Sequence, residues 1–593
     1  MKTKIETIRH SLAHVMASSV QKIYPEVKFG IGPDIENGFY YDFEFADIAK
    51  SKCQNPNAKP SSELKIQKKE IELTLNNLPK IQKQMKKFLS QNFSFEKKEI
   101  SKNEAKKIFK NQPYKLELIK KIKDEKISIY KCGNFIDLCA GPHIKSTKEI
   151  TTDAFALTKI AGAYWQGDEK NIMLTRIYGV AFETKKELDE YLKLQEEAEK
   201  RDHRKLGKKL ELFMFDEEIG QGLPIWLPKG AILRKIIEDY LHKELTLQGY
   251  DWLYTPHIGN LNLWKTSGHW NFYKENLYSP IKIDNENYLL KPMNCPFHVK
   301  VYNSKIRSHR DLPVKLAEFG TVYRYEKSGT MHGLTRVRGF TQDDAHIICD
   351  HNNIKKEVEK LIKHGLKILK TFGFTDYNIY LSTMPEKYAG SLEDWKKSTS
   401  ALELVLKKLN LKYKIDKGGG VFYGPKIDIK IKDSLKREWQ CTTVQFDFNL
   451  PEKFNMYYID KNGKKAKPYM IHRALLGSFE RFIGVLIEHY AGAFPFWLSP
   501  VQISIVPVGE KHIKYAKEIS EKLQALDLRI KLKNENESVS KKIRECEIQK
   551  IPYLLVLGDK EIKSKSVAVR ERGKKEIKTI KLKKFIENLS KLK

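Results

Sequence analysis

One stretch of the chain, residues 318–349, constrains the fold more than any other. Two segments with β character, 319–325 and 336–349, flank a polar loop that contains two glycines, so the stretch predicts an antiparallel hairpin. Successive side chains of a strand point to opposite faces of its sheet. One face of the second segment therefore carries Arg336, Arg338, Phe340, Gln342, Asp344 and His346.

The chemistry of this face is uncommon for a strand. Guanidinium groups hold phosphate oxygens, an aromatic ring stacks on a base, and a carboxylate binds an ammonium group. The face therefore predicts a site for a nucleotide beside an amino acid. The alternative is an ordinary half-buried strand that turns its polar face to water.

The segment RVRGFTQDDAHIIC resembles the motif 2 hairpin of class II aminoacyl-tRNA synthetases, in the form found in the threonyl-tRNA synthetase family. The resemblance covers essentially the whole chain and implies a multidomain α+β and α/β protein. It implies an N-terminal α+β editing domain, a class II catalytic domain with an antiparallel sheet, and a C-terminal α/β anticodon-binding domain. The expected boundaries are 1–184 for editing, 185–209 for a charged linker helix, 210–498 for catalysis and 499–593 for anticodon binding.

Length and composition agree with several globular domains. A chain of 593 residues has room for about four domains. The net charge of +33 suggests a polyanionic partner such as tRNA, although a lysine-rich genome would produce the same bias without any ligand. Seven scattered cysteines form no disulfide pattern, and no signal peptide or membrane span is evident, so we expect a cytoplasmic protein.

Two further segments resemble class II motifs. Residues 232–258 resemble motif 1, the dimerisation element, which implies a homodimer. Residues 468–490 resemble motif 3, with a strand ending near His472 and an amphipathic helix that carries Arg481 in its first turn. Considered alone, Arg481 would be read as a surface arginine; motif 2 upstream changes that interpretation.

The resemblance implies a role for each residue of the nucleotide site. Arg324 would bind the α-phosphate of ATP, Arg336 and Arg481 the β- and γ-phosphates, and Phe340 would stack on adenine, with Mg²⁺ accompanying ATP. Gln440 belongs to the same catalytic set. In the amino acid pocket, Asp344, Tyr423 and Gln445 would contact L-threonine.

Cys295, His346 and His472 are far apart in the sequence, and each alone would be read as a core residue. The resemblance implies that they form a zinc tripod, one ion per subunit, with an open coordination position. A metal that binds the threonine hydroxyl rejects valine, whereas serine keeps the hydroxyl and is rejected poorly. A site that edits Ser-tRNA(Thr) is therefore expected.

The first domain has a candidate for that editing site. His10 and His14 lie one helical turn apart, and Cys139 and His143 are four residues apart around a Gly-Pro turn. This is a four-ligand zinc pattern. The related alanyl enzymes hold zinc here, whereas the bacterial threonyl branch implies a metal-free pocket, which we favour, with Asp137 beside it. A lysine-rich stretch, about 61–109, predicts helix.

The segment from Pro500 onward alternates strands and helices and predicts a compact α/β unit with a mostly parallel sheet. Within it, Asn536, Glu561 and Arg570 match anticodon-contacting positions of the family. Members usually begin with a small β-grasp domain, which this chain is expected to lack because only nine residues precede His10.

Two other functions are compatible with parts of this sequence. Prolyl- and seryl-tRNA synthetases share the class II fold, but a prolyl enzyme has no use for a zinc that binds an amino alcohol. A synthetase-like RNA-binding or regulatory protein without aminoacylation would be expected to have lost Arg324, Arg481 or a zinc ligand, and all of these are present.

Overall fold

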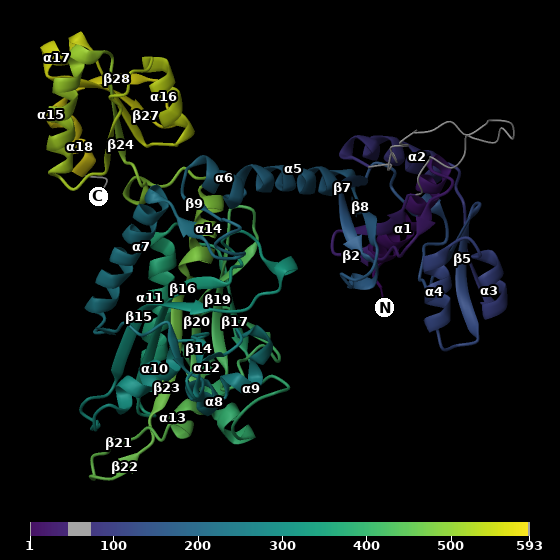
Figure 1. The fold of residues 1–593 in the computed structure, drawn as a ribbon, viewed down its shortest axis with the longest axis horizontal. Coiled ribbons are helices and arrows are strands. Elements are labelled where there is room, and N and C mark those ends of the chain that lie inside the picture. Colours follow the sequence, from purple (N-terminus) through teal and green to yellow (C-terminus); the bar gives the residue numbers. More distant parts are fainter. Residues whose placement is uncertain (1, 46–72, 591–593) are drawn as a thin grey trace. The chain divides into compact units, whose positions relative to one another are not determined.

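The computed structural model describes residues 2–45 and 73–590. The chain divides into two compact units, of which the first ends at Glu196 and the second begins at Glu197. Figure 1 shows the helices and strands of both units, coloured along the sequence. Within the described residues, no helix is both long and apolar enough to cross a membrane.

In the first unit, helix α1 (Lys4–Ile23) packs on an antiparallel sheet. Thr3 and Glu6 form a capping box at its start, and the apolar side chains of Leu12 and Met16 are buried against the aromatic residues of the sheet. The strand order is β1-β3-β8-β7, with β2 paired to β3. These strands are β1 (Lys28–Phe29), β2 (Asp34–Ile35), β3 (Gly38–Glu44), β7 (Phe155–Tyr164) and β8 (Met173–Ala181).

A second, three-stranded sheet of the first unit corrects the helical prediction for 61–109. Helix α2 (Leu78–Leu89) is present, but residues 95–101 form strand β4 (Phe95–Ser101), which pairs along its whole length with β5. Pairing with a neighbouring strand overrides local composition, and the lysines of β4 remain exposed. Residues 61–72 lie outside the described part of the chain. The other elements here are α3 (Lys102–Ile108), α4 (Pro113–Lys121), β5 (Lys126–Cys132) and β6 (Phe135–Leu138).

The expected single linker helix, 185–209, is two helices. Helix α5 (Lys185–Arg201) ends before Asp202, whose carboxylate accepts the Arg204 N–H and caps α6 (His203–Lys209). The second helix is anchored in the second unit, because it buries His203 and Leu206.

The second unit is built on an eight-stranded sheet in the order β11-β15-β16-β23-β20-β19-β17-β18. The pairings from β15 through to β17 are antiparallel, and the pairs at the two ends are parallel. This is the antiparallel sheet expected for the catalytic domain. Its strands are β11 (Asp251–Trp252), β15 (Val314–Tyr323), β16 (Gly339–Cys349), β17 (Tyr377–Ser382), β18 (Lys414–Asp416), β19 (Lys426–Lys432), β20 (Glu438–Asp447) and β23 (Tyr469–Ser478).

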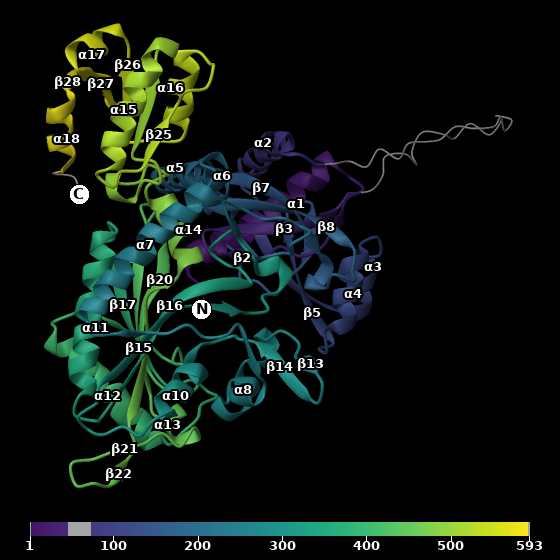
Figure 2. The ribbon, with the colours of Figure 1, turned by 60° about the vertical axis from the view of Figure 1, so that its left-hand side comes forward.

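Helices cover the two faces of this sheet differently. Figure 2 shows α11 (Ile354–Thr371) and α12 (Leu392–Lys408) on one side of the strands and α10 (Cys295–Asn303) on the other. On β16, Ala345 and Ile347 point into the core under α11, whereas Ile348 packs with Cys295 of α10. The alternation of β16 therefore sends its polar row toward the side of Cys295.

A bulge in strand β23 corrects the prediction that this strand ends near His472. The strand continues to Ser478 and leads directly into α14 (Phe479–His489). Its register against β16 shifts between Gln342 and Asp344. The Asp343 carboxylate accepts the backbone N–H groups of Leu475, Leu476 and Gly477 at 2.7, 3.1 and 3.0 Å, which stabilises the irregular segment.

The last part of the second unit is an α/β sheet in the order β25-β24-β26-β27-β28. Strand β24 is parallel to β25 and β26, but the pairs β26–β27 and β27–β28 are antiparallel, so the mostly parallel prediction is wrong for the second half. The elements are β24 (Ile503–Pro507), α15 (Ile513–Gln524), β25 (Ile530–Leu532), α16 (Val539–Ile548), β26 (Tyr553–Leu557), α17 (Asp559–Ser564), β27 (Ser566–Glu571), β28 (Ile577–Lys581) and α18 (Leu582–Ser590).

Helix α7 (Pro228–Leu247) precedes β11 and forms the helix-strand unit expected around residue 249. Shorter elements of the second unit are β9 (Phe213–Met214), β10 (Ile225–Trp226), β12 (Ile258–Asn260), α8 (Asn262–Ser267), α9 (His269–Phe272), β13 (Ile281–Ile283), β14 (Glu286–Leu290), α13 (Leu450–Lys453), β21 (Tyr458–Ile459) and β22 (Lys465–Ala466).

Candidate active site and editing pocket

Cys295, His346 and His472 come together in the second unit. His346 on β16 is paired directly with His472 on β23, and Cys295 begins α10 above them. Each residue offers one ligand atom, these atoms lie within 4.8 Å of one another, and all three side chains are buried. One sulfur and two imidazoles form a donor set that suits Zn²⁺.

Carboxylates behind the two histidines orient the rings. His472 Nε2 donates to Asp447 Oδ2 at 2.8 Å. The His346 Nδ1 atom is 2.9 Å from His298 Nδ1, and the other nitrogen of His298 lies 3.2 Å from Glu318 Oε1. Metal-binding histidines commonly use their second nitrogen in this way. Sequence reasoning missed these three supporting residues.

Burial favours the uncharged forms of the tripod. It drives the pKa of His346 well below its ordinary value, helped by the neighbouring His298 and His472. Burial also raises the pKa of Cys295, and the charge of Asp344 acts in the same direction. A thiolate at this position therefore needs a compensating cation, which agrees with the donor set.

A cavity of about 350 Å³ opens beside the tripod. The predicted alternating row is largely present in its lining, which includes Arg336, Phe340, Gln342, Asp344 and His346. Arg338 is the exception, because its Nε donates to the backbone carbonyl of Glu326 and its guanidinium lies over the Tyr325 ring.

The three arginines predicted to bind ATP all line this cavity, together with the buried Arg473. Arg324 is held by a hydrogen bond from its Nε to Pro292 O at 3.2 Å, with its guanidinium carbon 5.1 Å from the centre of the Phe340 ring. The Nε of Arg481 donates to Thr335 O at 3.1 Å, and Arg336 pairs with Glu326 at 3.0 Å. Burial lowers the pKa of Arg324 and of Arg481, but guanidinium groups remain charged in proteins.

The predicted amino acid ligands lie in the same cavity. Tyr423 donates its hydroxyl hydrogen to Gln445 Oε1 at 2.5 Å. The Asp344 carboxylate accepts from Asn294 Nδ2 at 3.0 Å and lies 3.8 Å from His346 Nε2. Gln440 also lines the cavity, and its amide nitrogen donates to Asp428 and Thr443, at 2.9 and 3.0 Å.

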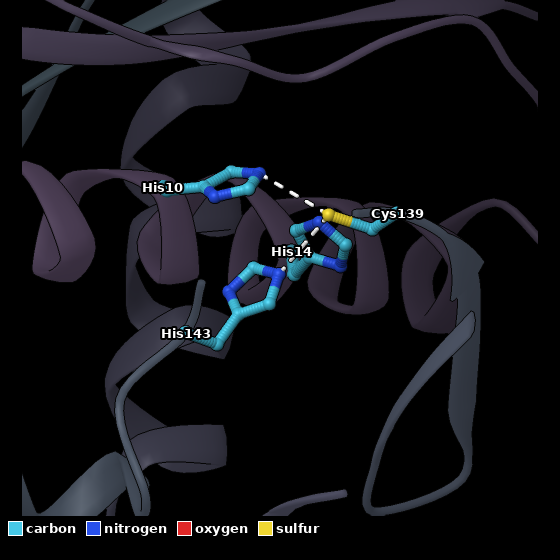
Figure 3. A group of neighbouring side chains, drawn as sticks. All are labelled: His10, His14, Cys139 and His143. Atoms are coloured by element: carbon cyan, nitrogen blue, oxygen red, sulfur yellow. Dashed lines mark hydrogen bonds between the residues drawn. The ribbon is translucent and has the colours of Figure 1, made fainter. Parts of the chain in front are cut away.

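A second group of side chains gathers in the first unit (Figure 3). His10 and His14 extend from α1 toward Cys139, whose sulfur lies 3.4 Å from His10 Nε2 and 3.3 Å from His143 Nε2. One ligand atom from each of the four residues lies within 4.8 Å of the others. The two short motifs singled out in the sequence therefore form one site, with a geometry that admits either a metal ion or a metal-free pocket.

Asp137 stands behind this pocket in a buried polar cluster. Its carboxylate accepts from Tyr41 OH at 2.6 Å and from Lys115 Nζ at 2.5 Å, and it lies 3.7 Å from His14 Nδ1. Lys115 is only 2% exposed. Sequence reasoning missed Tyr41 and Lys115, because neither lies in a recognisable motif.

Burial also favours neutral groups at this pocket. It raises the pKa of the Cys139 thiol to about 11 and lowers the pKa of His10 and of His14. Without a metal ion, the pocket therefore presents neutral imidazoles and a thiol at neutral pH.

The three predicted anticodon-binding residues lie on different elements of the last sheet domain. Asn536 is exposed in the segment after β25. Glu561 accepts the Gly558 N–H at 3.0 Å and so caps its own helix, and Arg570 on β27 lies 3.6 Å from Glu547. The structure places all three in one domain but on separate elements, and Glu561 and Arg570 each have a local partner.

Three family descriptions match the chain. Residues 278–490 match the tRNA synthetase class II core domain (G, H, P, S and T), residues 502–592 an anticodon binding domain, and residues 127–178 the threonyl and alanyl tRNA synthetase second additional domain.

Full-length relatives agree. The chain is 51% identical, over 597 aligned residues, to a threonine–tRNA ligase from Sulfurihydrogenibium sp. (strain YO3AOP1), covering 100% of this chain and 89% of that protein. It is 50% identical to a threonine–tRNA ligase from Dehalococcoides mccartyi (strain CBDB1), covering 96% and 93%. A crystal structure described as the RNA binding domain of threonyl-tRNA synthetase from Cryptosporidium parvum is 40% identical, with a TM-score of 0.63, covering 66% of this chain and 98% of that one.

Proposed function

Because this chain belongs to the threonyl-tRNA synthetase family, we propose that it activates L-threonine with ATP and transfers it to the 3′-end of tRNA(Thr). The observation that carries this proposal is the tripod of Cys295, His346 and His472 at the edge of a cavity lined by arginines. The tripod is suited to a small amino alcohol, and the arginines are suited to a triphosphate.

The fit of zinc rests on the donor set itself. Cys295, His346 and His472 would hold one ion per subunit, and three protein ligands leave a coordination position open. When bound, Zn²⁺ would supply a Lewis-acidic centre that favours an amino acid with a side-chain hydroxyl group. An apolar pocket separates threonine from valine by only about 1–3 kcal/mol, so a site that uses the hydroxyl is needed.

Side chains beside the tripod complete the amino acid pocket. Asp344 accepts from the threonine ammonium or hydroxyl group, and Asn294 holds this carboxylate in place. The hydrogen bond between Tyr423 and Gln445 fixes the opposite wall. These contacts turn the threonine carboxylate toward the arginines.

The arginines then position ATP. Arg324 holds the α-phosphate, Arg336 and Arg481 hold the β- and γ-phosphates, Phe340 stacks on adenine, and Mg²⁺ accompanies the nucleotide. The threonine carboxylate attacks the α-phosphate, giving threonyl-adenylate and pyrophosphate. Gln440, whose amide nitrogen is already bonded to protein, offers its amide oxygen to the same cavity.

The adenylate is consumed when the terminal adenosine 3′-hydroxyl of tRNA attacks its carbonyl carbon and AMP leaves. Serine keeps the hydroxyl that the tripod uses, and therefore some Ser-tRNA(Thr) forms. The pocket of His10, His14, Cys139 and His143 hydrolyses it. This pocket acts without metal: its neutral imidazoles and thiol orient a water molecule and the terminal ribose, and Asp137, with Lys115, fixes His14 from behind.

The remaining partners follow from the same assignment. Asn536, Glu561 and Arg570 contact the anticodon. The chain forms a homodimer through the α7–β11 unit, supported by the exposure of Leu247 (72%) and Tyr254 (94%) at its end, and it works in the cytoplasm. A regulatory protein without aminoacylation is not favoured, because the arginines and the tripod are all in place around one cavity.

The decisive test is the amino acid dependence of ATP–pyrophosphate exchange, with zinc content measured on the same sample. We expect exchange with threonine, slower exchange with serine, none with valine or proline, and about one zinc per chain. Exchange as fast with proline as with threonine would contradict the proposal.

A further inference from the structure

His203, the first residue of α6, is completely buried against the loop that joins β15 and β16. Its Nε2 accepts the backbone N–H of Leu334 at 3.0 Å, and its Nδ1 lies 2.6 Å from Glu488 Oε1. The fit is close: a Cβ on Gly333, which has φ +48°, would lie 2.2 Å from His203 Nε2.

These two contacts define the tautomer of His203. A backbone N–H can only donate, so Nε2 of the ring must accept and carries no proton. The proton is then on Nδ1, from which it is donated to the Glu488 carboxylate. Glu488 also accepts the backbone N–H of His203 at 3.1 Å, so a single carboxylate holds both the ring and its peptide.

The loop segment held by His203 supports the arginines of the ATP site. Leu334 is fully buried, and the next residue, Thr335, gives its carbonyl oxygen to Arg481 Nε. Arg336 follows immediately and lines the cavity with Arg481. A shift of the Leu334 peptide would therefore displace the backbone of Arg336 and the Thr335 carbonyl that holds Arg481.

Residues 201–203 also hold the C-terminal end of α14, the motif 3 helix. Glu488 lies in the last turn of α14, and the first turn of this helix carries Arg481. Arg201, just before α6, donates from one guanidinium nitrogen to the carbonyls of Glu488 and His489, at 3.4 and 3.1 Å. Arg437 pairs with the other oxygen of the Glu488 carboxylate.

We infer that His203 is a positioning residue for ATP: by accepting the Leu334 N–H, it fixes the loop segment that presents Arg336 and anchors Arg481. The inference rests on the proposed function for its reaction, but ATP affinity tests it independently. The predicted amino acid ligands Asp344, Tyr423 and Gln445 lie outside this loop segment and outside α14. We therefore expect the effect of His203 to be confined to ATP.

The test compares His203→Gln with His203→Asn. A glutamine amide reaches about as far as Nε2 and keeps an acceptor for the Leu334 N–H, whereas an asparagine amide reaches only about as far as Nδ1. Affinity for Mg²⁺·ATP is measured by calorimetry without amino acid, followed by KM and kcat in threonine-dependent exchange. We expect the asparagine variant to lose about tenfold or more in ATP affinity and in kcat/KM for ATP. The glutamine variant should stay within about threefold of wild type, and KM for threonine should change little in both.

The control is His364→Asn. His364 is another buried histidine paired with a glutamate, Glu244 at 3.3 Å, but it lies on α11 away from the loop. This variant should lower the thermal midpoint without changing ATP affinity. Equal ATP affinity for the glutamine and asparagine variants of His203 would overturn the inference, as would a loss of thermal stability alone. Loss of threonine dependence in the wild-type exchange would contradict the proposed function instead, and ATP affinity would still decide the role of His203.

Discussion

His346 and His472 face each other across the antiparallel strands β16 and β23, and the centres of their imidazole rings are 4.6 Å apart. The pairing of the two strands sets the distance between directly opposite residues, so this separation does not depend on the conformation of a loop. The tripod is thus built mainly on the sheet, and Cys295 is added from the start of α10.

Replacing Cys295 with alanine removes the one sulfur ligand. We expect zinc content to fall from about one per chain to near zero, and threonine-dependent exchange to fall by at least about 100-fold. Cys349→Ala is the control, because Cys349 is a buried cysteine of β16 that lies outside the tripod. This control variant should retain about one zinc per chain. Full exchange by the Cys295 variant would rule out the tripod.

Asp447→Asn tests the support behind His472. If His472 binds zinc as proposed, the neutral amide no longer compensates its imidazole, and zinc affinity should decrease by about 10- to 100-fold. Asp460→Asn is a suitable control: like Asp447, Asp460 accepts two backbone N–H groups, those of Asn462 and Lys464, but it lies in a turn away from the tripod. Zinc affinity is measured by competition with a chelator, and equal affinity in the two variants would contradict this role.

His14→Ala should disable editing while leaving activation intact. We expect Ser-tRNA(Thr) to accumulate in the presence of serine, with threonine-dependent exchange within about twofold of wild type. Lys115→Met should have the same effect, because Lys115 is bonded to the carboxylate of Asp137 behind His14. If serine-charged tRNA stayed at the wild-type level in both variants, editing would have to be assigned elsewhere.

Glu480 predicts a defined pH effect. Its carboxylate is buried and accepts the Thr341 N–H at 2.8 Å; burial raises its pKa from 4.5 to about 7, against the attraction of Arg234. Between these values the folded protein holds a proton that the unfolded chain has lost, so this contribution to stability is complete below pH 4.5 and decreases as pH rises through 7. Glu480→Gln removes this dependence. Between pH 4.5 and about 7, the thermal unfolding midpoint of the wild type should fall relative to that of the variant. The fall should correspond to about 3 kcal/mol in unfolding free energy. A constant difference from pH 5 to 8 would contradict the assignment.

Arg570→Ala should weaken aminoacylation without affecting activation. The side chain is partly exposed on β27. Losing a cation at the proposed tRNA contact should raise KM for tRNA about three- to tenfold and reduce the salt dependence of this KM. Lys574→Ala, a nearby exposed cation paired with Glu571, is the control. Identical tRNA parameters for the two variants would argue against Arg570 as an anticodon contact.

Strand alternation made the row on β16 predictable from sequence, because the two-residue period is a property of the extended backbone itself. It held for Phe340, Gln342, Asp344 and His346, which line the cavity, and failed for Arg338. The strand begins only at Gly339, so the period does not apply before it. The end of β23 was predicted wrongly for a related reason. The strand continues beyond His472 because Asp343 stabilises an irregular segment, which no local sequence pattern encodes.

Residues that act through distant contacts could not be found in this way. Lys115 meets Asp137, and His298 meets His346, only because separate elements fold onto one another. Asp447 was accessible in principle, since it lies two residues from Gln445 on the same strand. The roles assigned to the site residues remain predictions for the experiments above.

The bulge of β23 restricts insertions and deletions between His472 and Arg481. His472 lies before the bulge, and Arg481 begins the helix after it, on one uninterrupted piece of backbone. Inserting or deleting one residue between them would displace Arg481 relative to His472 and would also separate Leu475, Leu476 and Gly477 from Asp343. Length variation should therefore be absent from this interval in active descendants, and amino acid preference should evolve there by exchange of side chains alone.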